Sequence, residues 1–73
     1  MFSKEQFGAR MKQARELAGK SQATAAKDLG VTPAMLCDIE KGRRTTTIER
    51  FATFAAYYGI SADYLLGLKD EMK

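Results

Sequence analysis

The sequence has no histidine, no tryptophan, one cysteine and one proline in 73 residues. A single cysteine excludes an internal disulfide, and without histidine the usual Cys/His zinc sites cannot be assembled. Nucleophile elbows and phosphate-binding loops are also missing, so we expect neither an enzyme nor a cofactor. No apolar run approaches the roughly 20 residues that span a bilayer, and no signal peptide is recognisable. The sequence therefore predicts a soluble cytoplasmic protein with no membrane partner and no small-molecule ligand.

The length and charge distribution favour one small domain with an anionic partner. At 73 residues, a single hydrophobic core only just suffices. Residues 1–30 contain six basic and three acidic residues, residues 31–50 contain four and three, and residues 51–73 contain two and three. This gradient favours an anionic partner that docks on the first two thirds of the chain.

Glycine followed within three residues by serine or threonine recurs along the chain and predicts where helices end and begin. Glycine accepts the left-handed conformation at a helix C-terminus, and a hydroxyl oxygen can satisfy the free amides of the next first turn. Between these points apolar residues follow helical spacing, and no stretch shows strand alternation. The sequence predicts an all-α fold with five helices near residues 4–18, 22–29, 33–41, 48–58 and 62–66, the fourth beginning at the cap Thr47.

Residues 21–41 have the pattern of a helix-turn-helix: a short helix, a tight turn at Gly30-Val31, and a second helix with a Thr-Pro start. Small Ala25 and Ala26 allow the two helices to approach closely. In such motifs the N-terminal residues of the second helix face base edges in the major groove, while the first helix crosses the DNA backbone.

The segment "SQATAAKDLGVTPAMLCDIEKGRR" (residues 21–44) resembles the Cro/lambda-repressor-like helix-turn-helix family, also called the XRE family. The match extends upstream to Arg15 and downstream through "FAAYYGISADYLL" (residues 54–66). The resemblance implies a compact five-helix lambda-repressor-like DNA-binding domain over residues 1–67, with the helix-turn-helix at helices 2 and 3. Residues 68–73 are expected to form a short C-terminal tail. The implied partner is double-stranded DNA.

The resemblance assigns four side chains to the DNA backbone. Gln22, in the first turn of helix 2, matches a phosphate-clamping glutamine, and free amides and the helix dipole support an anion there. After helix 3, Lys41, Arg43 and Arg44 occupy positions where relatives contact the backbone, so we expect them to neutralise phosphates. The alternative for each is an ordinary solvated surface residue.

The helix-3 positions that would face bases carry unusual residue types. No Arg, Lys, Gln or Asn occurs in residues 33–39, although these side chains make the usual bidentate contacts with guanine and adenine. Pro33 and Ala34 can contact thymine methyl groups. Specificity should therefore be modest and depend partly on DNA shape. The positions that the resemblance makes base-facing are Pro33, Ala34, Cys37 and Asp38, with Met35 at the margin.

Two of these positions have competing interpretations. Asp38 could accept a hydrogen bond from cytosine, or it could form an ordinary surface pair with Lys41 three residues later. Cys37 could act as a redox switch, but there is no resolving cysteine and no feature beyond its helix position that would activate the thiol. A small groove-facing or half-buried residue is the favoured interpretation of Cys37.

Arg15 and Glu40 match a pair that forms a largely buried ion pair between helices 1 and 3 in the relatives. Removing one partner of such a pair would strand a buried charge, at a cost of about 3–5 kcal/mol. The implied role of both residues is structural.

The resulting prediction is a sequence-specific transcriptional regulator of the phage or mobile-element repressor type, acting as a dimer on a palindromic operator. A stand-alone protein and the DNA-binding part of a longer regulator are both consistent with the sequence. The alternative function is a protein-interaction module of the same fold, such as an antitoxin or a domain that has lost sequence reading. Candidates for the homodimer contact are Tyr57, Tyr64, Leu68 and Met72, with ordinary packing of helix 5 as the alternative.

Overall fold

The computed structural model describes residues 1–73 and contains five α-helices. They are α1 (Lys4–Leu17), α2 (Gln22–Leu29), α3 (Pro33–Glu40), α4 (Ile48–Tyr58) and α5 (Ala62–Leu66). The predicted all-α fold is confirmed, and each helix end lies within one residue of its predicted position. No helix combines the length and the apolar character that crossing a membrane requires.

Each helix begins after a hydroxyl side chain that accepts a hydrogen bond from a first-turn amide. The five capping residues are Ser3, Ser21, Thr32, Thr47 and Ser61. Such a cap contributes about 0.5–2 kcal/mol relative to alanine. Thr47 accepts from the Arg50 amide at 3.2 Å, which confirms it as the start of α4. The local sequence thus determines the helix starts directly.

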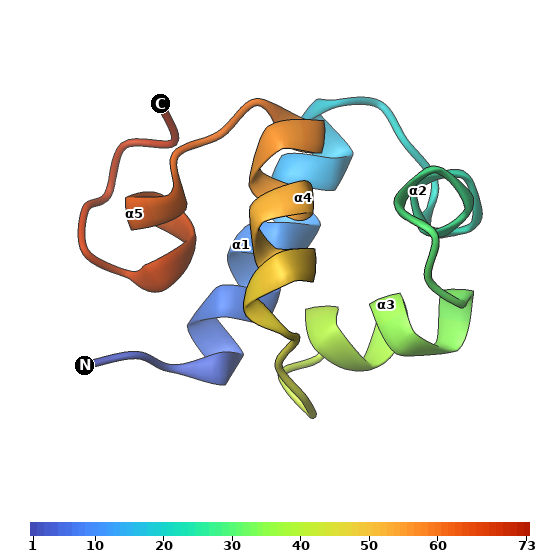
Figure 1. Cartoon of the computed structure of the whole chain (residues 1–73). Coiled ribbons are helices and arrows are strands. Elements are labelled where there is room, and N and C mark those ends of the chain that lie inside the picture. The colour runs from blue at the N-terminus through green and yellow to red at the C-terminus, as the bar shows by residue number, and fades with distance from the viewer.

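The helices surround one core, with α4 crossing in front of α1 in Figure 1, α5 on one side of them and α2 and α3 on the other. Phe7 of α1 and Phe51 of α4 meet with ring centroids 6.0 Å apart. The largest side chains that are less than 2% exposed come from α1, α3, α4 and α5: Phe7, Met11, Leu36, Ile39, Phe54 and Leu65. The inner face of α3 is therefore part of the main core.

Gly8 allows α1 to pass directly over the end of α3. A Cβ atom at this position would overlap the carbonyl oxygen of Ile39 and lie 2.9 Å from that of Glu40. Real Cβ atoms are almost never found this close to a carbonyl oxygen. The glycine therefore fixes the depth at which α3 seats against α1.

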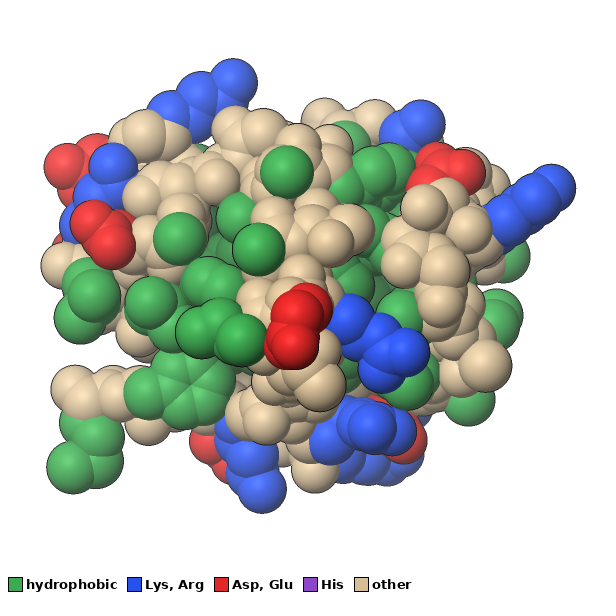
Figure 2. Space-filling view, viewed as in Figure 1, with side chains coloured by type: hydrophobic (Ala, Val, Ile, Leu, Met, Phe, Trp, Pro, Cys, Tyr) green, Lys and Arg blue, Asp and Glu red, His purple; other side chains and the backbone are tan.

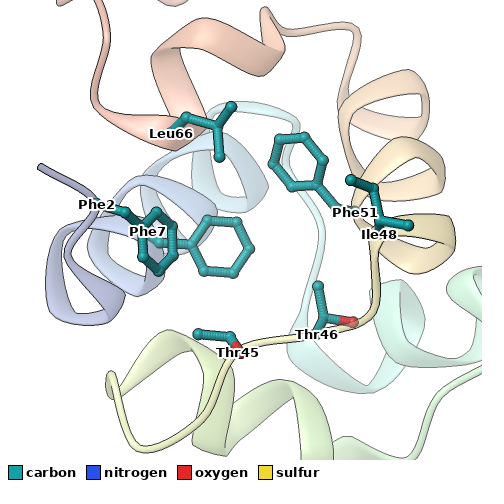
Figure 3. Close-up of a pocket in the computed structure, with 7 residues that line it drawn as sticks. All are labelled: Phe2, Phe7, Thr45, Thr46, Ile48, Phe51 and Leu66. Carbon is teal, nitrogen blue, oxygen red and sulfur yellow. The ribbon is translucent and has the colours of Figure 1, made fainter.

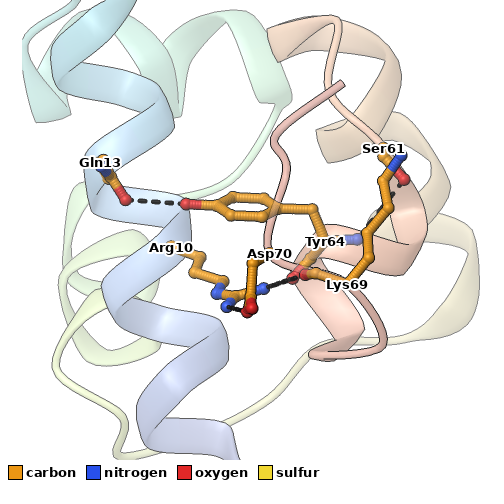
Figure 4. Close-up of polar contacts among 6 residues, drawn as sticks. All are labelled: Arg10, Gln13, Ser61, Tyr64, Lys69 and Asp70. Atoms are coloured by element: carbon orange, nitrogen blue, oxygen red, sulfur yellow. Dashed lines mark hydrogen bonds and ion pairs between the residues drawn. The ribbon is translucent and has the colours of Figure 1, made fainter.

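The C-terminal segment is held against α1 by Arg10 (Figure 4). The Arg10 guanidinium donates to the carbonyl oxygens of Tyr64 at 2.6 Å and Lys69 at 2.7 Å, and pairs with Asp70 at 3.1 Å. The Ser61 amide also donates to the Met72 carbonyl at 2.8 Å. Residues 68–73 thus lie along the body of the domain and extend the packing of α5.

Candidate nucleic-acid interface

The α2–α3 unit is held in shape by its turn. Gly30 has φ +73°, and the next amide, of Val31, donates to the Ala26 carbonyl at 3.0 Å. Thr32 then caps α3 by accepting from the Met35 amide at 3.0 Å. Ala25 and Ala26 are fully buried. The helix-turn-helix geometry expected from the sequence is present.

The two sides of α3 differ sharply in exposure. Leu36 and Ile39 are 0% exposed and pack into the core, whereas Pro33 and Ala34 are exposed. Residues i, i+1, i+4 and i+5 share one side of a helix, so Cys37 and Asp38 lie on the same side and are half-buried. We define the recognition stripe as Pro33, Ala34, Cys37 and Asp38. Met35 lies at its edge and packs partly against the core.

Glu40 connects three helices at the inner end of α3. Arg15 donates to its carboxylate from Nε at 2.8 Å and from Nη2 at 3.1 Å. The two side chains are only 11% and 2% exposed. The hydrogen bond to Glu40 raises the pKa of Arg15, although burial opposes the shift. Bidentate geometry and low exposure make this an anchor for α3, matching the structural role assigned to the pair.

Gln22 is also directed toward Glu40. Its Nε2 donates to Glu40 Oε1 at 3.0 Å, and the residue is half-buried. A glutamine amide has two N–H donors and one carbonyl acceptor, so one donor and the oxygen have no partner within the protein. The predicted phosphate ligand is therefore already oriented by the pair that anchors α3.

The cations after α3 lie on the surface beside the recognition stripe. Lys41 is the C-cap of α3, and Lys41, Arg43 and Arg44 are all exposed. In the space-filling view, Lys and Arg side chains gather along the edge where α3 ends and the loop to α4 begins (Figure 2). The structure thus brings the three predicted phosphate neutralisers to one rim of the stripe.

The alternative pairing of Asp38 with Lys41 is not formed, because Asp38 pairs instead with Arg43 at 3.5 Å. The chain turns back at Gly42, where φ is +77°, and the Arg43 amide donates to the Asp38 carbonyl at 2.9 Å. This turn brings Arg43 next to Asp38. The Arg43 side chain is 65% exposed and the Asp38 side chain 41%, so this ion pair contributes little to stability.

Sequence reasoning missed Arg50, which lies in the first turn of α4. Its Nη1 donates to Met35 Sδ on α3 at 3.7 Å. The available signal was the position itself, because a cation in a first turn opposes the helix dipole and so suggests a use other than helix stability. Arg50 adds a fourth exposed cation beside the stripe.

The candidate dimer contacts do not gather on one surface. Tyr57 is half-buried, and its hydroxyl donates to Asp28 of α2 at 2.6 Å. This hydrogen bond raises the pKa of Tyr57. Leu68 follows α5, which lies on the opposite side of α4 from α2 (Figure 1), and it is 71% exposed. Met72 packs partly against the core. Only Leu68 presents most of its side chain.

Tyr64 was a candidate for the dimer contact, with ordinary packing as the alternative, and its assignment to the contact is wrong because the residue is 5% exposed. Its ring lies under the Arg10 guanidinium, 4.3 Å from the centroid. Its hydroxyl donates to Gln13 Oε1 at 2.7 Å (Figure 4). A tyrosine with both its ring and its hydroxyl engaged inside the fold cannot line a dimer surface. The alternative of ordinary packing of α5 against α1 holds for this residue.

An open apolar pocket of about 240 Å³ lies behind the α3–α4 loop. Figure 3 shows aromatic and aliphatic side chains of α1, α4 and α5 around it, closed on one side by the loop threonines. No charged residue lines the pocket, which therefore belongs to the apolar support of the loop. Its lining residues are Phe2, Phe7, Thr45, Thr46, Ile48, Phe51 and Leu66.

A model of the helix-turn-helix family matches residues 11–65. The chain is 37% identical over 66 residues to the HTH-type transcriptional regulator ImmR of Bacillus subtilis (strain 168). That match covers 90% of this chain and 51% of ImmR, so the chain spans about half the length of this curated relative.

Solved structures give the same picture. The restriction-modification controller protein C.AhdI from Aeromonas hydrophila superposes with a TM-score of 0.77 at 26% identity, covering 85% of this chain and 90% of that one. The S. venezulae BldD DNA-binding domain superposes with a TM-score of 0.75 at 26% identity, covering 86% and 94%.

Proposed function

Because this chain belongs to the helix-turn-helix family, we propose that it is a sequence-specific DNA-binding transcriptional regulator. The observation that carries the proposal is the arrangement of α3. Its inner side is anchored by the core and by Glu40, its outer side is the recognition stripe, and cations rim that stripe. An exposed helix of this kind, held rigidly and bordered by positive charge, suits the DNA major groove.

In the proposed complex α3 enters the major groove with its first turn toward the bases. Pro33 and Ala34, both exposed, contact thymine methyl groups, and half-buried Cys37 adds a small contact. Asp38 faces the same groove, where its pairing with Arg43 shields its charge from the phosphates. The sequence preference is modest because the stripe offers few hydrogen bonds to bases.

The backbone contacts in this complex come from both ends of the helix-turn-helix. Lys41, Arg43 and Arg44 neutralise phosphates along one groove wall. Gln22 donates its remaining side-chain N–H to a phosphate at the N-terminus of α2, where the helix dipole favours an anion. Its hydrogen bond to Glu40 fixes the direction of this contact relative to α3.

We further propose a repressor that binds a palindromic operator in the cytoplasm as a homodimer and blocks polymerase. Two-fold symmetric operators with half-sites about one helical turn apart call for a two-fold symmetric protein. The names of ImmR, a transcriptional regulator, and C.AhdI, a controller protein, support regulation. Leu68, 71% exposed, is the proposed centre of the dimer contact, and Tyr57, whose hydroxyl is bonded to Asp28, lies outside it.

Site selection from a random pool of DNA duplexes, followed by binding at several salt concentrations, tests the proposal. We expect a palindromic site and a steep fall of affinity with salt. The double variant R43A/R44A should weaken binding to every sequence and flatten the log–log salt slope by up to about two units. Lys73→Ala, at the C-terminus away from α3, serves as the control with one charge removed (Figure 1). Salt-insensitive binding to proteins only would instead support the interaction module.

A further inference from the structure

Arg50 reaches from the first turn of α4 to the flank of α3. Its Nη1 donates to Met35 Sδ at 3.7 Å. A thioether sulfur is a weak acceptor, so this contact directs the side chain along α3 without fixing it. The other N–H groups of the guanidinium remain free to bind another acceptor.

Nothing within the protein neutralises Arg50. It is exposed and takes part in none of the three ion pairs, which join Arg10 to Asp70, Arg15 to Glu40 and Arg43 to Asp38. Its place in the first turn of α4 is unfavourable for the helix dipole. An unpaired arginine at such a position is suited to an external acceptor.

The acceptor is indicated by where Met35 lies. Met35 occupies the first turn of α3, the end that approaches base edges in helix-turn-helix docking. The recognition stripe offers methyl groups and one carboxylate but no bidentate donor, and arginine is the commonest reader of guanine O6 and N7. We infer that Arg50, carried on α4, is a specificity-determining residue that reads a guanine at the edge of each half-site. This inference rests on the proposed DNA binding.

The test compares the full chain with Arg50→Ala, Arg50→Lys and the control Lys73→Ala, in site selection from random duplexes and in binding to the selected site. We expect the unaltered protein and K73A to select a guanine at one position of each half-site. R50A should lose this preference and bind the selected site about tenfold to hundredfold more weakly. R50K should lose it too, because lysine keeps the charge but lacks the planar fork.

A second DNA duplex with that guanine replaced separates base reading from phosphate binding. On it, the unaltered protein and R50A should bind with nearly equal affinity. The inference is overturned if R50A keeps every base preference, binds all DNA sequences more weakly by the same factor and has a salt slope lower by about one unit. In that case R50K would bind like the unaltered protein. That pattern describes a phosphate contact and leaves the proposed function intact. An unaltered protein that selects no DNA sequence overturns the proposed function and this inference together.

Discussion

Gln22 and Glu40 are joined by a hydrogen bond of 3.0 Å from Gln22 Nε2 to Glu40 Oε1. The same carboxylate accepts two hydrogen bonds from Arg15, so it connects α1, the start of α2 and the end of α3. The proposed phosphate ligand, Gln22, is therefore oriented by a structural ion pair. The stability of the fold and the geometry of the interface depend on the same carboxylate.

Replacing Glu40 by Gln should destabilise the domain by about 3–5 kcal/mol, because the Arg15 charge is left nearly buried without an anionic partner. Urea unfolding followed by circular dichroism measures the change. Asp38→Asn is the matched control, since it breaks the exposed pair with Arg43 and should cost less than about 1 kcal/mol. Equal losses for the two variants would contradict the assignment of Glu40 as the anchor.

Gly8→Ala should destabilise the domain even though alanine is the better helix former. The added methyl group would overlap the Ile39 carbonyl oxygen, and overpacking of this kind costs about 1–3 kcal/mol. The gain in helix propensity, up to about 1 kcal/mol, only partly offsets it. Thermal unfolding should show a lower midpoint for G8A. The control is Ala9→Gly on the exposed side of α1, which measures the difference in helix propensity between alanine and glycine without a change in packing. A G8A protein more stable than the unaltered chain would show that α1 can shift away from α3.

The sequence predicted the helices well because their determinants are local. A hydroxyl cap such as Thr32 or Thr47 and the glycine before it specify a helix start within a few residues. The anchor formed by Arg15 and Glu40 was reached through the family resemblance, which assigns both partners to positions in a known fold. Neither required knowledge of how this chain packs at long range.

Two of the misses share a different cause, namely contacts between residues distant in sequence. Tyr64 was named as a candidate dimer contact, but Arg10 and Gln13 of α1, more than fifty positions away, contact its ring and its hydroxyl. The contact of Arg50 with Met35 likewise depends on where the loop of residues 41–47 places the first turn of α4 relative to α3. Helical periodicity distinguishes the inside of a helix from its outside, but it does not identify the element that covers it. The pairing of Asp38 with Arg43 depended on the turn at Gly42, which helical spacing does not describe.

Tyr58→Phe should change the alkaline stability of the domain. Burial raises the pKa of Tyr58 to about 12, and the nearby Glu40 charge contributes. The pKa of tyrosine in the unfolded chain is about 10, lower than in the folded protein. The neutral Tyr58 therefore makes its full contribution to the free energy of unfolding below about pH 10, and this contribution is lost as pH rises through about 12. We expect unfolding free energies of the unaltered protein to fall relative to Y58F across this window.

Below pH 10 the same variant should be at least as stable as the unaltered protein, because the Tyr58 hydroxyl is buried without a hydrogen-bond partner. Urea unfolding at pH 8, 10 and 11.5 measures both effects. Tyr57→Phe is the comparison at pH 8, since it removes a hydroxyl that is bonded to Asp28 and should lose stability where Y58F does not. If the difference in unfolding free energy between Y58F and the unaltered protein stays constant with pH, the Tyr58 hydroxyl is exposed to water and not buried.

Asp38→Asn should strengthen binding to DNA of every sequence. The Asp38 side chain is 41% exposed on the recognition stripe, where phosphates on both groove walls would repel its charge. The substitution also leaves the whole charge of Arg43, whose guanidinium lies 3.5 Å from the carboxylate, to act on the phosphate it contacts. We expect affinity to rise about threefold to tenfold at low salt, with a steeper salt slope. The control is K41A, because Asp38 does not contact Lys41. In this variant the affinity for DNA should fall and the salt slope should become shallower. If D38N instead abolishes a preference for cytosine at one position and leaves other sequences unchanged, Asp38 reads a base directly and its pairing with Arg43 breaks on binding.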